Sequence, residues 1–263
     1  MVIAKPAMQF QQLLGNNMNN ILRAAFVAAL GLAAIAPAQA SLYTSSYGTQ
    51  LSGPSNCDDC YAGPIAFTGT GQSVGFFGNT YSSLFAGSNG YVTFGAGYSS
   101  FSTQALDIQT VAPMIAAFYT DLDSRGDDAS NVYANTTTEG EIVITWENMG
   151  HFAGDYSVRS TFQILLRSDQ LVAQSGLNQI GVFYGDVSDT RQVSAGFGDG
   201  LAESNAGEVA FASFVQGTTL SNNTARYYNL NGGVPVDVPE PASLALLGIG
   251  LAGCLAAKRR KAG

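Results

Sequence analysis

The sequence predicts an all-β protein with an antiparallel, β-sandwich-like single domain. Between Tyr43 and about Val234, short apolar stretches alternate with Gly, Asn, Asp and Ser. Two of these stretches have the period of two that is typical of strands, and no sustained helical period interrupts the series. So many short strands favour a sandwich or a barrel. We expect a signal helix before this domain and a single membrane-spanning sorting helix after it.

Residues 1–40 have the features of a secretory signal. They contain no acidic residue, carry two basic residues, and run without charge from residue 24 to residue 36. The small residues Ala38 and Ala40 are typical of a signal-peptidase site. Cleavage is therefore expected before Ser41, which places the following domain outside the inner membrane.

The clearest predicted strand covers residues 157–167, where apolar and polar side chains alternate. Residues 141–148 repeat the pattern, with Thr145 and Glu147 on the polar face. Alternation of this length predicts a sheet with one buried face, which leaves polar residues such as Gln163 mostly on the other. Further strands are expected at residues 73–77, 90–94, 111–119, 131–134, 179–184 and 208–214.

Cys57 and Cys60 form a Cys-Asp-Asp-Cys sequence. In an oxidising compartment this spacing favours a small structural disulfide. A zinc site would need further ligands, and the single histidine, His151, is far away in the sequence. A redox role would need a helix after Cys60, and no helical pattern follows it.

The charges are segregated along the chain. All 19 acidic residues lie between Asp58 and Glu240, and the same stretch holds five arginines and no lysine, a net charge of −14. Such a surface repels phosphate backbones, which excludes nucleic acid as an expected partner. It suits a protein that stays soluble and meets cations or neutral sugars.

Four carboxylates follow the expected strand at residues 111–119. Asp121, Asp123, Asp127 and Asp128 lie within eight residues of a glycine-containing loop. Calcium prefers six to eight oxygen ligands, so these residues are a candidate calcium site; no other cofactor is expected. The alternative is a solvated turn that Arg125 partly neutralises.

Residues 235–263 predict a linker and a sorting tail. Pro239, Glu240 and Pro241 precede sixteen uncharged residues at 242–257. As a helix these would span roughly 24 Å, slightly short for a hydrocarbon core of about 30 Å. By the positive-inside rule the basic end stays cytoplasmic, and the acidic domain lies on the other side. The basic end consists of Lys258, Arg259, Arg260 and Lys261.

These three parts, in this order, resemble the PEP-CTERM sorting signal of Gram-negative bacteria. The resemblance implies that an exosortase-type membrane protease processes the tail, in hosts that commonly make exopolysaccharide. It also implies a membrane-anchored intermediate and delivery to the cell surface or the extracellular matrix.

The middle of the chain resembles a nidogen-like (NIDO) domain, with a core at about residues 75–215 inside a domain at 41–234. The resemblance implies a β-rich extracellular module associated with cell-matrix adhesion. The matching pieces are residues 88–95, 111–123, 144–152, 161–166, 180–187 and 194–200.

These features together predict an exported adhesion or biofilm-matrix protein that is not an enzyme and that binds extracellular polysaccharide or matrix proteins. Two alternatives stay open. One is a secreted polysaccharide-active enzyme, for which Glu141 and Glu147 are a candidate carboxylate pair; the other is a purely structural matrix component. Aromatic residues in loop-like stretches are candidates for stacking on sugars: Tyr43, Tyr47, Tyr98, Phe101, Tyr227 and Tyr228.

Overall fold

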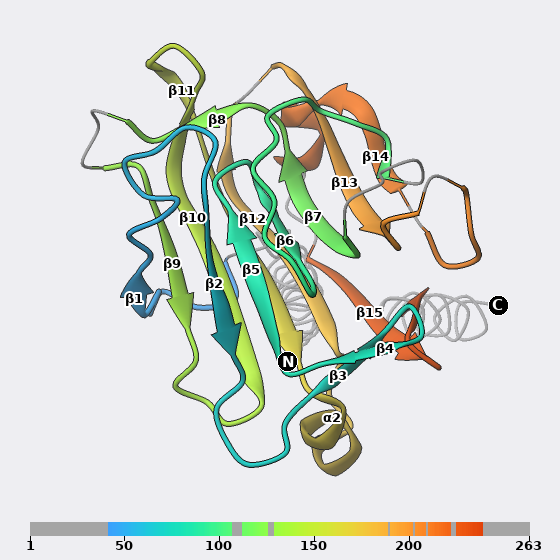
Figure 1. Ribbon diagram of the computed structural model, residues 1–263. Coiled ribbons are helices and arrows are strands. Elements are labelled where there is room, and N and C mark those ends of the chain that lie inside the picture. Colours follow the sequence, from blue (N-terminus) through green and yellow to red (C-terminus); the bar gives the residue numbers. More distant parts are fainter. Residues whose placement is uncertain are drawn as a thin grey trace, which may run out of the picture. The chain divides into compact units, whose positions relative to one another are not determined.

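The computed structural model describes residues 42–106, 112–125, 129–188, 190–201, 203–208, 210–221 and 225–238. All of them belong to one compact unit, residues 40–263. They form antiparallel sheets with one short α-helix, which confirms the all-β prediction (Figure 1). Among these residues, no helix combines the length and the apolar character needed to cross a membrane. The expected signal helix and sorting helix lie outside the described residues.

The larger sheet has eight strands in the described residues. Along it β10 (Glu141–His151) and β11 (Asp155–Arg167) form the longest pair, in a register that places Ile144 opposite Ile164 and Trp146 opposite Phe162. The order is β1 (Thr49–Gln50), β9 (Asn131–Asn135), β10, β11, β12 (Ile180–Val187), β15 (Arg226–Asn231) and β16 (Val234–Asp237), and β8 (Leu122–Asp123) also pairs with β10.

The smaller sheet has six strands in the same part of the chain. Its order is β14 (Ala210–Gln216), β13 (Gln192–Gly198), β7 (Met114–Tyr119), β6 (Tyr91–Thr93), β5 (Ser83–Gly87) and β2 (Tyr61–Ala66). A separate hairpin consists of β3 (Val74–Phe76) and β4 (Asn79–Tyr81). Every strand expected from the sequence overlaps one of these strands. Several were not expected, including β2, β5, β13 and β15.

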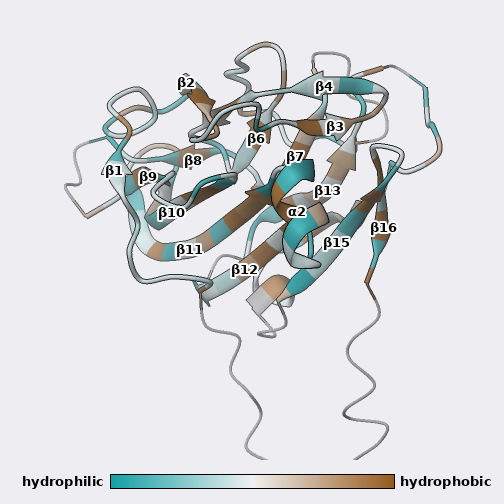
Figure 2. Ribbon diagram, turned by 90° about the horizontal axis from the view of Figure 1, so that it is seen from below, coloured by the Kyte–Doolittle hydropathy of each residue, from teal (hydrophilic) through white to brown (hydrophobic). Residues whose placement is uncertain are grey.

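The two sheets share one hydrophobic core, which contains apolar side chains from both. Figure 2 shows hydrophobic segments, in brown, on strands of both sheets. Phe162 of the larger sheet lies between Trp146 and Phe118, with ring centroids 5.0 Å and 5.2 Å away. Trp146 also donates a hydrogen bond from Nε1 to the carbonyl oxygen of Gly87 in the smaller sheet (2.8 Å). This residue therefore joins the two sheets by apolar contact and by a buried hydrogen bond.

The larger sheet is buried on both faces at its centre, so the prediction of one buried face was wrong. Thr145 and Gln163 are fully buried. Residues 42–48, here called the amino-terminal strap, cover this outer face. Gln163 accepts a hydrogen bond from the backbone N of Thr44 (3.2 Å) and donates one to its carbonyl oxygen (2.8 Å). Polar side chains here are buried because the strap satisfies their hydrogen bonds.

The sequence pattern also missed helix α2 (Asp169–Ser175). The side chain of Ser168 caps its amino terminus by accepting a hydrogen bond from Leu171 N, and Gly176 ends it in the left-handed region at φ +66°. Both are preferred capping residues. Two turns are too short for a helical period to be visible in the sequence.

Candidate functional site

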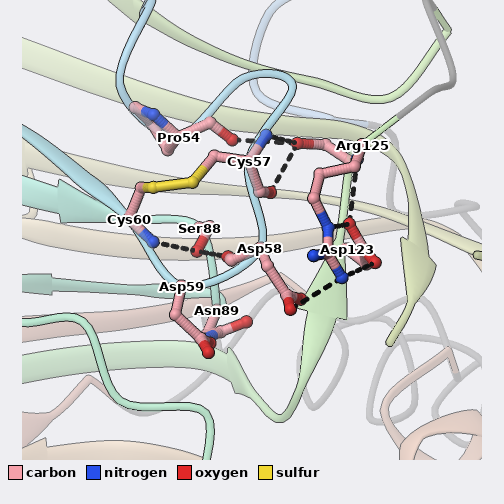
Figure 3. The surroundings of a disulfide bond; sticks show 10 residues. Pro54, Cys57, Asp58, Asp59, Cys60, Ser88, Asn89, Asp123 and Arg125 are labelled. Carbon is pink, nitrogen blue, oxygen red and sulfur yellow. Dashed lines mark hydrogen bonds and ion pairs between the residues drawn. A yellow bond between two sulfur atoms is a disulfide. The ribbon is translucent and has the colours of Figure 1, made fainter. Parts of the chain in front are cut away.

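A disulfide-closed loop lies beside the smaller sheet, where Cys57 and Cys60 are joined (Figure 3). Cys57 N donates to Ser124 Oγ (3.0 Å), and Cys60 N donates to Ser88 Oγ (3.1 Å). Ser88 follows β5 and Ser124 follows β8, and both are buried. The loop is therefore fixed at each cysteine to a different part of the fold.

Three carboxylates meet at this loop. Asp58 and Asp59 lie between the cysteines and Asp121 follows β7, and one oxygen of each lies within 4.8 Å of the others. We call these three residues the carboxylate cluster. Asn89 connects its parts, because its Nδ2 donates to Asp59 Oδ1 (2.8 Å) and its Oδ1 accepts from Leu122 N (2.8 Å). The cluster thus depends on the turn between β5 and β6.

Arg125 neutralises only part of this negative charge. Its Nη2 lies 2.8 Å from Asp58 Oδ2 and 2.7 Å from Asp123 Oδ2. Two other carboxylate oxygens, Asp58 Oδ1 and Asp121 Oδ1, are buried and have no hydrogen-bond partner among the described residues. Unpaired buried oxygens of this kind are unfavourable unless a proton or a cation joins them. Oxygen ligands from carboxylates are the donors that calcium prefers.

Burial and the neighbouring charged side chains shift the pKa values of Asp121 and Asp123. Burial, and then repulsion from Asp58, Asp59 and Asp123, raises the pKa of Asp121 to about 6. Because this value exceeds the ordinary 3.8, the stability that protonated Asp121 contributes is lost as the pH rises through about 6. Burial also acts to raise the pKa of Asp123, but hydrogen bonds from Arg125 outweigh burial and lower it.

The structure places the residues of the expected calcium site in different settings. Asp121 belongs to the carboxylate cluster, whereas Asp123 faces Arg125 and accepts its hydrogen bonds. Asp127 and Asp128 lie outside the described residues. Sequence reasoning missed Asp58 and Asp59, although two carboxylates inside a four-residue disulfide loop are a signal that could have been used.

Three exposed aromatic residues are connected to the cluster through neighbouring backbone. Tyr61 follows Cys60, Phe152 N donates to the carbonyl oxygen of Asp121 (3.2 Å), and Phe101 follows Ser100, whose carbonyl oxygen accepts from Asn89 (3.1 Å). Their exposed fractions are 46%, 52% and 54%. We call these three residues the aromatic rim.

The aromatic residues expected to stack on sugars have different environments. Phe101 is exposed, and Tyr43 is 38% exposed, whereas Tyr228 is buried in the core. Tyr47, Tyr98 and Tyr227 are partly buried. Of the six, the structure places only Phe101 in the aromatic rim.

The candidate pair Glu141 and Glu147 does not join this site. Glu141 is buried and accepts from Arg167 Nε (2.9 Å), so an arginine already neutralises it. The signal-cleavage residues 38–41 and the sorting residues 239–241 and 258–261 lie outside the described residues. The last described residue is Val238, whose N donates to the carbonyl oxygen of Tyr227 (3.1 Å).

Comparison with known proteins gives two adjoining matches. Residues 35–236 match the family model described as NIDO related. Residues 237–261 match the model of the PEP-CTERM protein-sorting motif. No solved structure matches the chain.

Proposed function

Because this chain belongs to the NIDO-related family, we propose that it is a non-catalytic adhesion or matrix component, which works outside the cell. The PEP-CTERM motif implies export, processing by an exosortase and a surface or extracellular location. The finer proposal is that the host is a Gram-negative bacterium that makes exopolysaccharide, and that the domain acts in adhesion or in a biofilm matrix.

The observation that carries this proposal is the direct succession of the two matches. The NIDO-related match ends at residue 236 and the sorting motif begins at residue 237, so no other domain lies between them. The strong negative charge and the closed disulfide loop both suit an extracellular location.

We propose that the binding surface is the carboxylate cluster together with the aromatic rim, and that its ligand is an extracellular polysaccharide. Flat aromatic side chains offer large rigid apolar faces at low entropic cost. A cation held by the cluster would supply a second kind of contact, to the hydroxyl or carboxylate oxygens of a sugar. The fixed backbone at Cys57 and Cys60 supports the proposal, because a rigid site loses little entropy on binding.

Replacing Tyr61 and Phe152 together by alanine is expected to weaken polysaccharide binding at least tenfold, since two stacking faces are lost. The measurement is calorimetric or pull-down binding of the purified protein to exopolysaccharide from its own host. Leu201→Ala is the control, because Leu201 is 58% exposed and lies in the loop after β13. Equal binding by all three proteins would contradict the proposed surface, and no binding by any would favour a purely structural component.

Calcium is proposed as the cation of the carboxylate cluster. Millimolar calcium is expected to raise the Tm of the wild-type protein, because a ligand that binds only the folded state stabilises it by mass action. Asp121→Asn should reduce this rise, whereas Asp186→Asn, at an exposed position of β12, should keep it. Differential scanning calorimetry with calcium or with a chelator measures both. An unchanged wild-type Tm would rule calcium out.

One observation favours the enzymatic alternative. Three carboxylates lie close together, and the pKa values of two of them, Asp58 and Asp121, are raised by burial, which is the kind of arrangement that glycosidases use. However, Asp58 and Asp59 are consecutive residues of one closed loop, which restricts how a sugar ring could lie between them. We propose binding without hydrolysis; new reducing ends after incubation with host exopolysaccharide would favour the enzyme instead.

A further inference from the structure

The chain enters and leaves the described domain on the larger sheet. At the start, Leu42 lies against β12, since a Cβ added to Gly185 would come 3.4 Å from Leu42 Cδ2. Tyr43 packs its ring on Phe183 with centroids 5.4 Å apart. These contacts fix the entry point on the outer face of the larger sheet.

The exit point is connected to the same face. The ring of Tyr227 contacts Phe183 with centroids 5.5 Å apart, and the backbone of Tyr227 accepts the hydrogen bond from Val238. Phe183 therefore contacts residues that fix both ends of the domain. Phe183 belongs to a small outer cluster with Val143 and Leu165, separate from the core between the sheets.

The connection from this exit point to the expected membrane segment is short. Val238 is held by the sheet, and the apolar run begins at residue 242, which leaves residues 239–241. Three extended residues reach roughly 11 Å. The expected cleavage before Ser41 removes residues 37–40 with the signal, so the tail provides the connection to the membrane. This connection is too short to pass around the edge of the domain to the outer side of the smaller sheet, because it would have to cover the spacing of about 10 Å between the sheets and also the side chains that extend beyond them.

We infer that the outer face of the larger sheet is the membrane-facing surface of this protein while the sorting tail is attached, and that removal of the tail exposes it. The smaller sheet, with the carboxylate cluster and the aromatic rim beside it, then points away from the membrane. Figure 2 shows β11, β12 and β15 on one side and β2, β4 and β6 on the other. The inference rests on the proposed function in one respect, because it requires that the tail holds the precursor in the membrane.

Single cysteines placed on the two faces test this orientation. Ser45 is an exposed residue of the strap. Val236 is 41% exposed and pairs with Asn229, so it points to the outer side, opposite to the core residue Tyr228. Ser99 is the matched control. It is exposed, and its neighbour Tyr98 packs on the face of the smaller sheet that points away from the larger sheet.

The experiment labels Ser45→Cys, Val236→Cys and Ser99→Cys with a bulky maleimide, in cells lacking the exosortase-type protease and in cells that contain it. Cys254→Ala removes the remaining thiol, because Cys57 and Cys60 are joined. In the precursor, labelling at positions 45 and 236 should be several-fold lower than in the processed protein, whereas labelling at position 99 should be equal. Labelling of the processed form shows that each variant is folded alike.

Membrane extraction of the precursor distinguishes a wrong orientation of the domain from a tail that does not anchor the precursor in the membrane. A precursor that only detergent releases, but that labels equally at all three positions, would overturn the inferred orientation and leave the proposed function standing. A precursor that washes from the membrane without detergent would overturn both the orientation and the proposed anchoring by the tail.

Discussion

Replacing Trp146 by alanine is expected to lower the free energy of unfolding by about 3–5 kcal/mol. The side chain is fully buried, packs on Phe162 and donates a hydrogen bond to Gly87 across the two sheets. The substitution removes apolar contacts and leaves a cavity, and it also leaves a buried carbonyl oxygen without its partner. Urea unfolding followed by circular dichroism measures the change.

Trp146→Phe separates the two contributions. Phenylalanine keeps an aromatic ring against Phe162 and loses the donor to Gly87, so a loss of about 1–3 kcal/mol is expected from the unpaired carbonyl. If alanine cost no more than phenylalanine, packing against Phe162 would not be the main contribution. Gly87 directly precedes Ser88 and Asn89, which hold Cys60 and Asp59, so both variants should also weaken the calcium binding that we propose for the carboxylate cluster.

Replacing Arg167 by methionine is expected to lower the free energy of unfolding by about 3–5 kcal/mol, because it leaves the carboxylate of Glu141 buried without a counter-charge. The side chains of Arg167 and Glu141 are only 6% and 10% exposed, and their ion pair measures 2.9 Å. Arg167 also donates to the carbonyl oxygen of Asn178 (2.7 Å) and to the hydroxyl of Tyr43 (3.0 Å). Chemical denaturation again provides the measurement.

The double variant Arg167→Met with Glu141→Leu is the matched control. Removing both charges should restore most of the stability, because a buried ion pair replaced by apolar residues of similar size is often nearly neutral. A double variant as unstable as the single one would show that packing, rather than the isolated charge, causes the loss. Tyr43→Phe should cost only about 1 kcal/mol, the contribution of one hydroxyl.

The long strands could be predicted because their own side chains carry the signal. In β10 and β11 the alternation of apolar and polar residues repeats often enough to define a strand. The short strands β5 and β15 have too few residues to do so, and α2 is defined by its caps rather than by a period. The burial of Thr145 and Gln163 could not be predicted, because the strap that covers them is more than ninety positions away from either.

The candidate site could be predicted only in part from the sequence, because its residues are also far apart along the chain. Asp121 stood out among neighbouring carboxylates, but its partners Asp58 and Asp59 come from a loop more than sixty residues earlier. Arg125 was expected to neutralise the loop in part, and the structure shows which carboxylates it contacts, namely Asp58 and Asp123.

The family, the sorting motif and the all-β class of this protein can be recognised from the sequence alone, because each depends on residues that are close together along the chain. The three-dimensional fold was needed to show which carboxylates meet, which face of the larger sheet the strap covers, and that the chain enters and leaves the domain on one side. These features depend on distances between segments that are remote in the sequence, and strand pairing and core packing determine those distances.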